Sequence, residues 1–224
     1  MMWTELARAP MPDGGELTLR QSGETFEIRC NGWDLMSNRA HRSEEAMARL
    51  ACAGLGAAPR VLIGGLGMGF SLCAALDALP GTARVVVAEL VPEIIEWNRG
   101  PLATLAGRPL DDARVSVHCG DVADLLGTGA SFDAILLDID NGPAMPIYRR
   151  TPRVYQADGV ASARRSLAPG GVLAVWSADP SDSFESTLTQ CGFAWRGIEI
   201  SVRDDDSGPW HTIYLARPET AMVA

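Results

Sequence analysis

The chain has 224 residues, a length that suits one sizeable α/β core with a short extension. Its formal net charge of −9 at pH 7 argues against binding to nucleic acid, although it is compatible with a cationic substrate such as an amine. No stretch approaches 18 uninterrupted apolar residues, so no membrane span is expected. The N-terminal residues include no apolar signal region, and the five cysteines include no C-x-x-C pair. Together with three dispersed histidines, this predicts a reduced cytoplasmic protein without a metal site.

Residues 1–58 are expected to form an extension made of a β-hairpin and one helix. Apolar and polar residues alternate in short stretches joined by turns, which predicts extended segments at 16–20, 25–30 and 33–36. Ser43, followed by two glutamates, predicts a helix that continues to about Leu55.

Residues 59–224 alternate strands with helices, which predicts right-handed crossovers and a doubly wound sheet. Apolar runs predict strands at 61–64, 84–89, 114–118, 132–138 and 172–176. Helices are predicted between and after them at 69–79, 92–105, 122–126, 153–167 and 181–191. The last two segments, 193–202 and 211–216, are predicted to pair antiparallel across the acidic turn at 204–209.

The most informative stretch is the apolar run that begins at Val61 and enters a glycine cluster. Its glycines are Gly64, Gly65, Gly67 and Gly69, and a glycine turn after a buried strand lets a ligand approach the backbone closely. A second apolar strand ends in Glu89, 20 residues after Gly69. A carboxylate at that place can accept hydrogen bonds from both hydroxyls of a ribose, so the combination predicts a nucleoside cofactor.

Two classes of cofactor fit a glycine turn followed by an acid: the nicotinamide or flavin dinucleotides and S-adenosylmethionine. The dinucleotide fingerprint is G-x-G-x-x-G, whereas the loop here has the tighter spacing of Gly65, Gly67 and Gly69. This spacing resembles the first motif of the class I S-adenosylmethionine-dependent transferases. The turn at 167–173 resembles the L-x-P-G-G-x-L turn of the same superfamily. The resemblance implies a Rossmann-like, mixed seven-stranded sheet with a C-terminal antiparallel pair.

Within this superfamily the chain most resembles the spermidine synthase (polyamine aminopropyltransferase) family, over about residues 16–217. The segments that carry the resemblance are 61–69, 85–97, 110–115, 120–121 and 132–143. It implies that Gly64, Gly65, Gly67 and Gly69 surround the cofactor, that Glu89 binds the ribose, and that Asp121 and Val122 contact the adenine.

The fourth strand ends at Asp138, where the resemblance places the reaction centre. The family's D-x-x-D loop for substrate amines aligns with Asp138 and Asn141, and Asp140 is the candidate replacement for the second carboxylate. An amine is protonated near pH 7, so Asp138 is expected to align it and relay its proton, while Asp140 and Asn141 orient it. Candidate aromatic residues for the acceptor pocket are Tyr148, Trp176 and Trp210.

Gly67 stands where the family carries an acid that favours decarboxylated S-adenosylmethionine. An acid there would repel the carboxylate of intact S-adenosylmethionine, so its loss favours methyl transfer to a small-molecule acceptor as the main expectation. Aminopropyl transfer from the decarboxylated form is the alternative, a nucleoside-binding protein without turnover is another, and a dinucleotide oxidoreductase is the least favoured. A homodimer is expected, because strands within 16–36 can extend the sheet of a partner.

Overall fold

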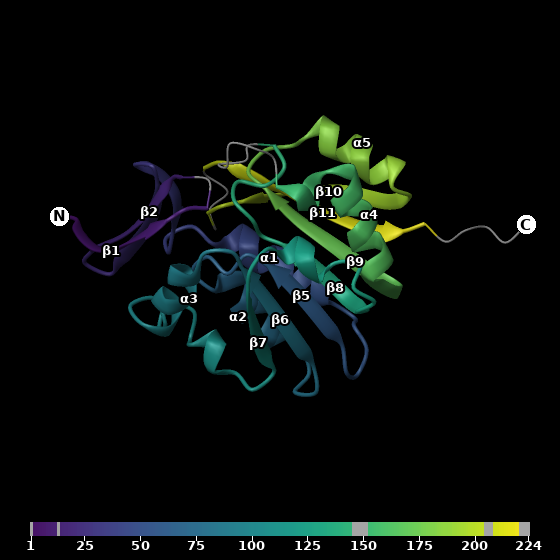
Figure 1. Cartoon of the computed structure of the whole chain (residues 1–224), viewed down its shortest axis with the longest axis horizontal. Coiled ribbons are helices and arrows are strands. Elements are labelled where there is room, and N and C mark those ends of the chain that lie inside the picture. The colour runs from purple at the N-terminus through teal and green to yellow at the C-terminus, as the bar shows by residue number, and fades with distance from the viewer. Residues whose placement is uncertain (1, 13, 145–151, 204–207, 220–224) are drawn as a thin grey trace, which may run out of the picture.

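Two β-sheets organise the chain, as the computed structural model shows for residues 2–12, 14–144, 152–203 and 208–219 (Figure 1). The smaller sheet is antiparallel, with strands in the order β1 (Thr4–Pro10), β2 (Glu16–Ser22), β3 (Thr25–Cys30) and β4 (Trp33–Ser37). Strand β1 was not predicted, because only Ala9 is buried in it and no alternation of apolar residues marks it. The N-terminal part is therefore a four-stranded sheet, one strand larger than the sequence indicated.

The larger sheet has seven strands in the order β10-β11-β9-β8-β5-β6-β7. Its strands are β5 (Arg60–Gly64), β6 (Arg84–Glu89), β7 (Val115–Cys119), β8 (Phe132–Leu137), β9 (Leu167–Ser177), β10 (Phe193–Ser201) and β11 (Trp210–Pro218). Pairs among β5 to β9 are parallel, whereas β11 pairs antiparallel with both β9 and β10. The predicted mixed sheet with a C-terminal antiparallel pair is confirmed, and residues 204–207 of the predicted turn lie outside the described residues.

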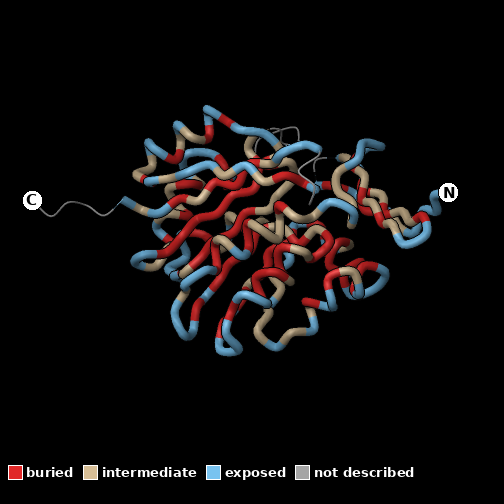
Figure 2. Tube along the Cα trace, turned by 180° about the vertical axis from the view of Figure 1, so that it is seen from behind, coloured by how far each residue is buried: buried red, intermediate tan, exposed pale blue. Residues whose placement is uncertain are grey.

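Helices cover both faces of this sheet. They are α1 (Arg42–Cys52), α2 (Phe70–Ala78), α3 (Pro92–Arg99), α4 (Ala157–Ser166) and α5 (Asp182–Gln190), with 3₁₀ turns at η1 (Pro109–Asp111), η2 (Val122–Leu125) and η3 (Arg153–Tyr155). Side chains of a strand alternate between two cores: Val61 and Ile63 pack with α1 and α2, and Leu62 packs with α4 and α5. The central strands are consequently buried along their length (Figure 2). Within the described residues, no helix combines the length and the apolar character needed to cross a membrane.

Two predicted boundaries are wrong for local reasons. The helix expected at 92–105 ends at Arg99, because Gly100 leaves the helical conformation and its N–H caps the carbonyls of Glu96 and Trp97. Pro101, which follows, has no N–H to continue the helix. The strand expected at 172–176 begins earlier, at Leu167, which pairs with Phe132 of β8.

Helix α1 belongs by sequence to the predicted extension, yet it packs on α2 and on strands β8 and β9 of the larger sheet. The smaller sheet lies beyond the end of the larger sheet at which β5 leads into α2 (Figure 1). The division of the chain after residue 58 stays a prediction.

Candidate functional site

The site lies at the point in the larger sheet where successive strands of the chain stop being added on one side of β5 and are added on the other. From β5 the chain builds β6 and β7 on one side and then returns to place β8 on the other side of β5. In open α/β sheets, ligands bind at the carboxyl ends of the strands at such a switch point. A first cavity of about 180 Å³ lies there, lined by Gly65 after β5, Glu89 at the end of β6, Asp121 after β7 and Asp138 after β8. All four strand ends that the sequence singled out therefore meet at one place.

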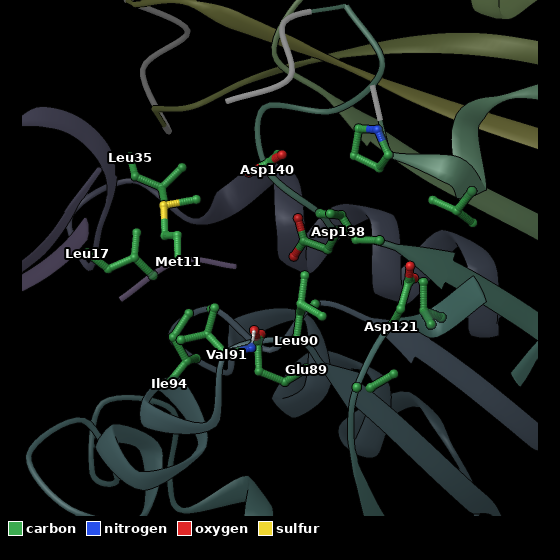
Figure 3. A pocket seen from close by; sticks show the side chains of 18 of the residues that line it. Met11, Leu17, Leu35, Glu89, Leu90, Val91, Ile94, Asp121, Asp138 and Asp140 are labelled. Carbon is green, nitrogen blue, oxygen red and sulfur yellow. Dashed lines mark hydrogen bonds between the residues drawn. The ribbon is translucent and has the colours of Figure 1, made fainter. Parts of the chain in front are cut away.

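The smaller sheet closes the opposite side of this first cavity. Met11, Leu17 and Leu35 contribute apolar side chains to its wall, and Asp121 lies on the side away from them (Figure 3). A cavity with one apolar wall and a few polar groups at strand ends suits a flat, partly apolar ligand such as a nucleoside.

The glycine loop passes close to the end of β8. Gly65 has a φ of +90°, and a Cβ at this position would lie 2.0 Å from the carbonyl oxygen of Asp138. No residue with a side chain fits there without displacing the backbone. Gly67, with a φ of +52°, also lines the first cavity, and a Cβ there would meet the side chain of Met36 at 3.0 Å. Gly64 and Gly69 border the loop without lining the cavity.

Glu89 is buried and its carboxylate is tied to the glycine loop. Its Oε2 accepts a hydrogen bond from the Leu66 N–H at 2.9 Å, and its Oε1 accepts one from the Val91 N–H at 2.9 Å. Burial raises the pKa of this carboxyl, and the backbone hydrogen bonds oppose that rise. Glu89 also lines the first cavity, which places its carboxylate where a ligand hydroxyl can reach it.

Asp121 has the local role that its place before a short helix suggests. Its Oδ1 accepts a hydrogen bond from the Ala123 N–H at 2.9 Å and so caps η2. Val122 follows it, is buried, and lines the first cavity together with Asp121. Capping is compatible with ligand contact, because the second carboxylate oxygen of Asp121 is not used in the cap.

Asp138 joins the first cavity to a second one. Its backbone N–H donates to the Gly64 carbonyl at 2.8 Å, and its Oδ2 accepts a hydrogen bond from the hydroxyl of Ser71 on α2. Burial raises the pKa of the Asp138 carboxyl to about 6. Asp140, in the left-handed region with a φ of +54°, lines both cavities, and Asn141 lines the second. The three candidate catalytic residues are thus brought together.

The second cavity, of about 290 Å³, lies on the other side of Asp138. Trp176, a candidate for the acceptor pocket, lines it, and Phe70 adds a second aromatic ring. Trp210 was expected there but is largely exposed instead, since it begins the outer strand pair. Tyr148, the third aromatic candidate, lies outside the described residues.

Two titratable residues of the second cavity, Glu44 and His211, were not predicted. Glu44 is partly buried in the first turn of α1, where burial first and repulsion by Asp138 second raise its pKa to about 7. The sequence marks a pair of glutamates at the start of this helix, but nothing in the pattern shows which of them faces the cavity. His211 lies 168 residues after Ser43 of α1, and no local signal links His211 to this helix.

The described linings of both cavities carry negative charge and contain no arginine; their carboxyl groups are those of Glu44, Glu89, Asp121, Asp138 and Asp140. The chain has no lysine at all. The site as described is therefore suited to a cationic ligand and opposed to an anionic one.

The strand order and the antiparallel C-terminal pair define the fold of the class I S-adenosylmethionine-dependent transferases. No family model matches the chain. It is similar to a polyamine aminopropyltransferase of Mycobacterium tuberculosis, at 29% identity over 200 residues that cover 84% of this chain and 36% of that protein. A polyamine aminopropyltransferase of Nitrosomonas europaea is 35% identical over 104 residues, 45% of this chain and 30% of that protein. The chain thus spans about a third of the length of these curated relatives.

Solved structures share the fold at low sequence identity. A spermidine synthase from Thermotoga maritima superposes with a TM-score of 0.75 at 16% identity, covering 97% of this chain and 74% of that one. A spermidine synthase in complex with the transition-state analogue AdoDATO has a TM-score of 0.73 at 16% identity, with the same coverage. The resemblance to the spermidine synthase family is confirmed.

The expectation of methyl transfer is wrong by these comparisons, since the relatives are named for aminopropyl transfer, the stated alternative. The physical reason lies in the second cavity. The argument from Gly67 considered one position of one loop, whereas carboxyl groups reach the same place from α1 and from the end of β8.

Proposed function

We propose that the chain transfers an aminopropyl group from decarboxylated S-adenosylmethionine to a small amine. The observation that carries this proposal is the charge of the two cavities, whose described linings hold five carboxyl groups and no arginine. Intact S-adenosylmethionine would bring a carboxylate into this environment. The decarboxylated donor brings only cationic groups, and so does an amine acceptor.

Each candidate residue then has a defined task. Glu89 accepts hydrogen bonds from the ribose hydroxyls, Asp121 and Val122 contact the adenine, and the backbone of Gly65 and Gly67 passes beside the donor's tail. Asp138, which lines both cavities, aligns the acceptor amine and takes up its proton. Asp140 and Asn141 orient the acceptor from the loop after β8.

The reaction is a single in-line displacement. The nitrogen of the neutral amine attacks the carbon attached to the sulfonium, the carbon–sulfur bond breaks, and sulfur keeps the electron pair as a neutral thioether, methylthioadenosine. The protein contributes by holding both reactants in line and by excluding water from the cavity.

The direct test offers the purified chain each donor with a linear diamine as acceptor. Production of methylthioadenosine and of an aminopropylated amine with the decarboxylated donor alone is the expected result. A methylated product formed from intact S-adenosylmethionine would refute the proposal, and so would the absence of turnover with either donor.

Acceptor binding is expected to strengthen as the pH rises from about 5 to about 8. Burial raises the pKa of Asp138 to about 6 and that of Glu44 to about 7. Both carboxyl groups are therefore protonated at about pH 5 and ionised at about pH 8. An alkylammonium stays charged to about pH 10, so only the protein changes charge in this window. Calorimetric titration of the diamine into the complex with methylthioadenosine, in buffers of different ionisation heat, should show proton release near neutral pH. A pH-independent affinity without proton release would contradict the expectation, and Glu44→Gln should remove the upper part of the transition.

We also propose that the protein acts as a cytoplasmic homodimer. The smaller sheet supports this, because its outer strands β1 and β4 have free edges among the described residues, and Trp3, Leu6 and Trp33 are exposed on it. Light scattering from the purified chain measures the state of association, and a monomer at micromolar concentration would count against the dimer.

A further inference from the structure

Where α1, β9 and β11 meet, three side chains are joined through one hydroxyl. Ser43 is fully buried, and its Oγ lies 2.5 Å from Oε2 of Glu44 and 2.9 Å from Nδ1 of His211. The Nε1–H of Trp176 donates to the same Oγ at 3.0 Å. Glu44, Trp176 and His211 all line the second cavity, and the displacement reaction described above uses none of these bonds.

Counting protons at Ser43 leaves two arrangements. The indole of Trp176 can only donate, so it permanently occupies one acceptor position of Oγ. With Glu44 ionised, the hydroxyl donates to Glu44, and His211 donates from Nδ1–H to Ser43. With Glu44 protonated, Glu44 donates to Ser43, the hydroxyl donates to Nδ1, and His211 carries its proton on Nε2. In both arrangements Oγ accepts two hydrogen bonds and donates one.

The two arrangements interconvert by moving protons along the chain. When the Glu44 proton passes to Oγ, the Ser43 proton passes to Nδ1 of His211, and the Nε2 proton leaves to water. Glu44 is then ionised, Ser43 has exchanged one proton for another, and the imidazole is neutral again. The net result is that Glu44 has lost one proton and water has gained one. The ring returns to its Nε2–H form by exchanging protons with water before the next transfer.

We propose that Glu44, Ser43 and His211 form a proton-transfer chain that carries the proton taken from the acceptor amine away from Asp138. This inference rests on the aminopropyl transfer proposed above, in which Asp138 ends each reaction protonated and must lose that proton before the next one. The Asp138 proton moves to the Glu44 carboxylate through a water molecule in the cavity, and Glu44 passes it on through Ser43.

The surrounding charges suit this direction. Burial, followed by the charges of Asp138 and of the neighbouring Glu45, raises the pKa of Glu44 to about 7, so this carboxyl can take up a proton near neutral pH. Burial lowers the pKa of His211, opposed by the charge of Asp179, so the ring is neutral near pH 7 and can carry its proton on either nitrogen.

The kinetic test separates the first reaction from later ones. His211→Asn keeps an amide near Nδ1 that can bond to Ser43 but cannot pass a proton. Its first turnover should keep the wild-type rate, while its steady-state rate should fall about 10²-fold, the low end for loss of an acid–base group. A burst of one product per site should result. The control is His118→Asn, the same replacement on β7 at a residue that lines neither cavity, and it should change neither phase.

A second variant and a second measurement keep the test decisive if His211→Asn does not fold. Ser43→Ala removes the link itself and should produce the same burst. In protein with ¹⁵N-labelled histidine, lowering the pH through about 7 should move the His211 proton from Nδ1 to Nε2, and Glu44→Ala should abolish this change. Only three histidines are present, so the resonances can be assigned by replacement.

The outcomes distinguish the two proposals. Wild-type protein that does not use the decarboxylated donor would refute the aminopropyl transfer and this inference with it. An active wild type whose variants show equal slowing of first and later turnovers, or no slowing, would refute the proton chain alone. So would a His211 tautomer that does not change with pH.

Discussion

Asp138→Asn is expected to lower turnover by about 10²–10⁴-fold while leaving the affinity for methylthioadenosine nearly unchanged. The amide keeps the size of the carboxylate and can still accept the hydrogen bond from Ser71, so the end of β8 should stay in place. It can neither take up the proton of the acceptor nor balance its charge. Steady-state kinetics and calorimetric titration of methylthioadenosine measure the two effects separately.

The control for this variant lies near the opposite end of β8. Asp133 accepts a hydrogen bond from the Arg60 N–H at the other end of β8, and Asp133→Asn should retain wild-type turnover. If Asp138→Asn loses affinity for methylthioadenosine in parallel with turnover, Asp138 supports the donor site as a whole and has no separate task toward the acceptor.

Glu89→Ala is expected to weaken nucleoside binding by about 1.5–3 kcal/mol, the usual contribution of hydrogen bonds to a charged group. The loss should appear as a higher dissociation constant for methylthioadenosine, with most of the turnover recovered at saturating donor. Because Glu89 also holds the N–H groups of Leu66 and Val91, thermal unfolding without ligand should show a smaller, separate loss of stability.

Glu96→Ala on α3 provides the comparison, since Glu96 is exposed and pairs only with Arg99 among the described contacts. It should leave both nucleoside affinity and unfolding temperature close to wild type. An unchanged nucleoside affinity in Glu89→Ala would show that the ribose lies elsewhere.

The half of the site proposed to bind the donor was predictable because it is built from consecutive signals. A strand, a glycine turn and the acid at the end of the next strand are each visible in a few residues, and parallel strands bring such ends to one edge. Glu89, Asp121 and Asp138 line the first cavity for this reason.

The half proposed to bind the acceptor was only partly predictable, because its remaining groups come from distant segments. Ser43 and His211 are 168 residues apart and meet only because α1 packs on the face of the larger sheet near β11. Glu44 and Glu45 are residues of the same type, and they differ only in the direction of their side chains, which the sequence does not show. The error about methyl transfer has the same origin, since a charge argument based on Gly67 alone omitted carboxyl groups supplied by other elements.

Asp138 is anchored by the glycine turn after β5 and by the start of α2. Its N–H bonds to Gly64, its carbonyl lies against Gly65, and its carboxylate accepts from Ser71, all between the end of β5 and the first turn of α2. These three contacts all come from residues outside the loop that follows β8. Under the proposed function, substitutions in the loop that follows β8 should therefore change acceptor preference without displacing Asp138.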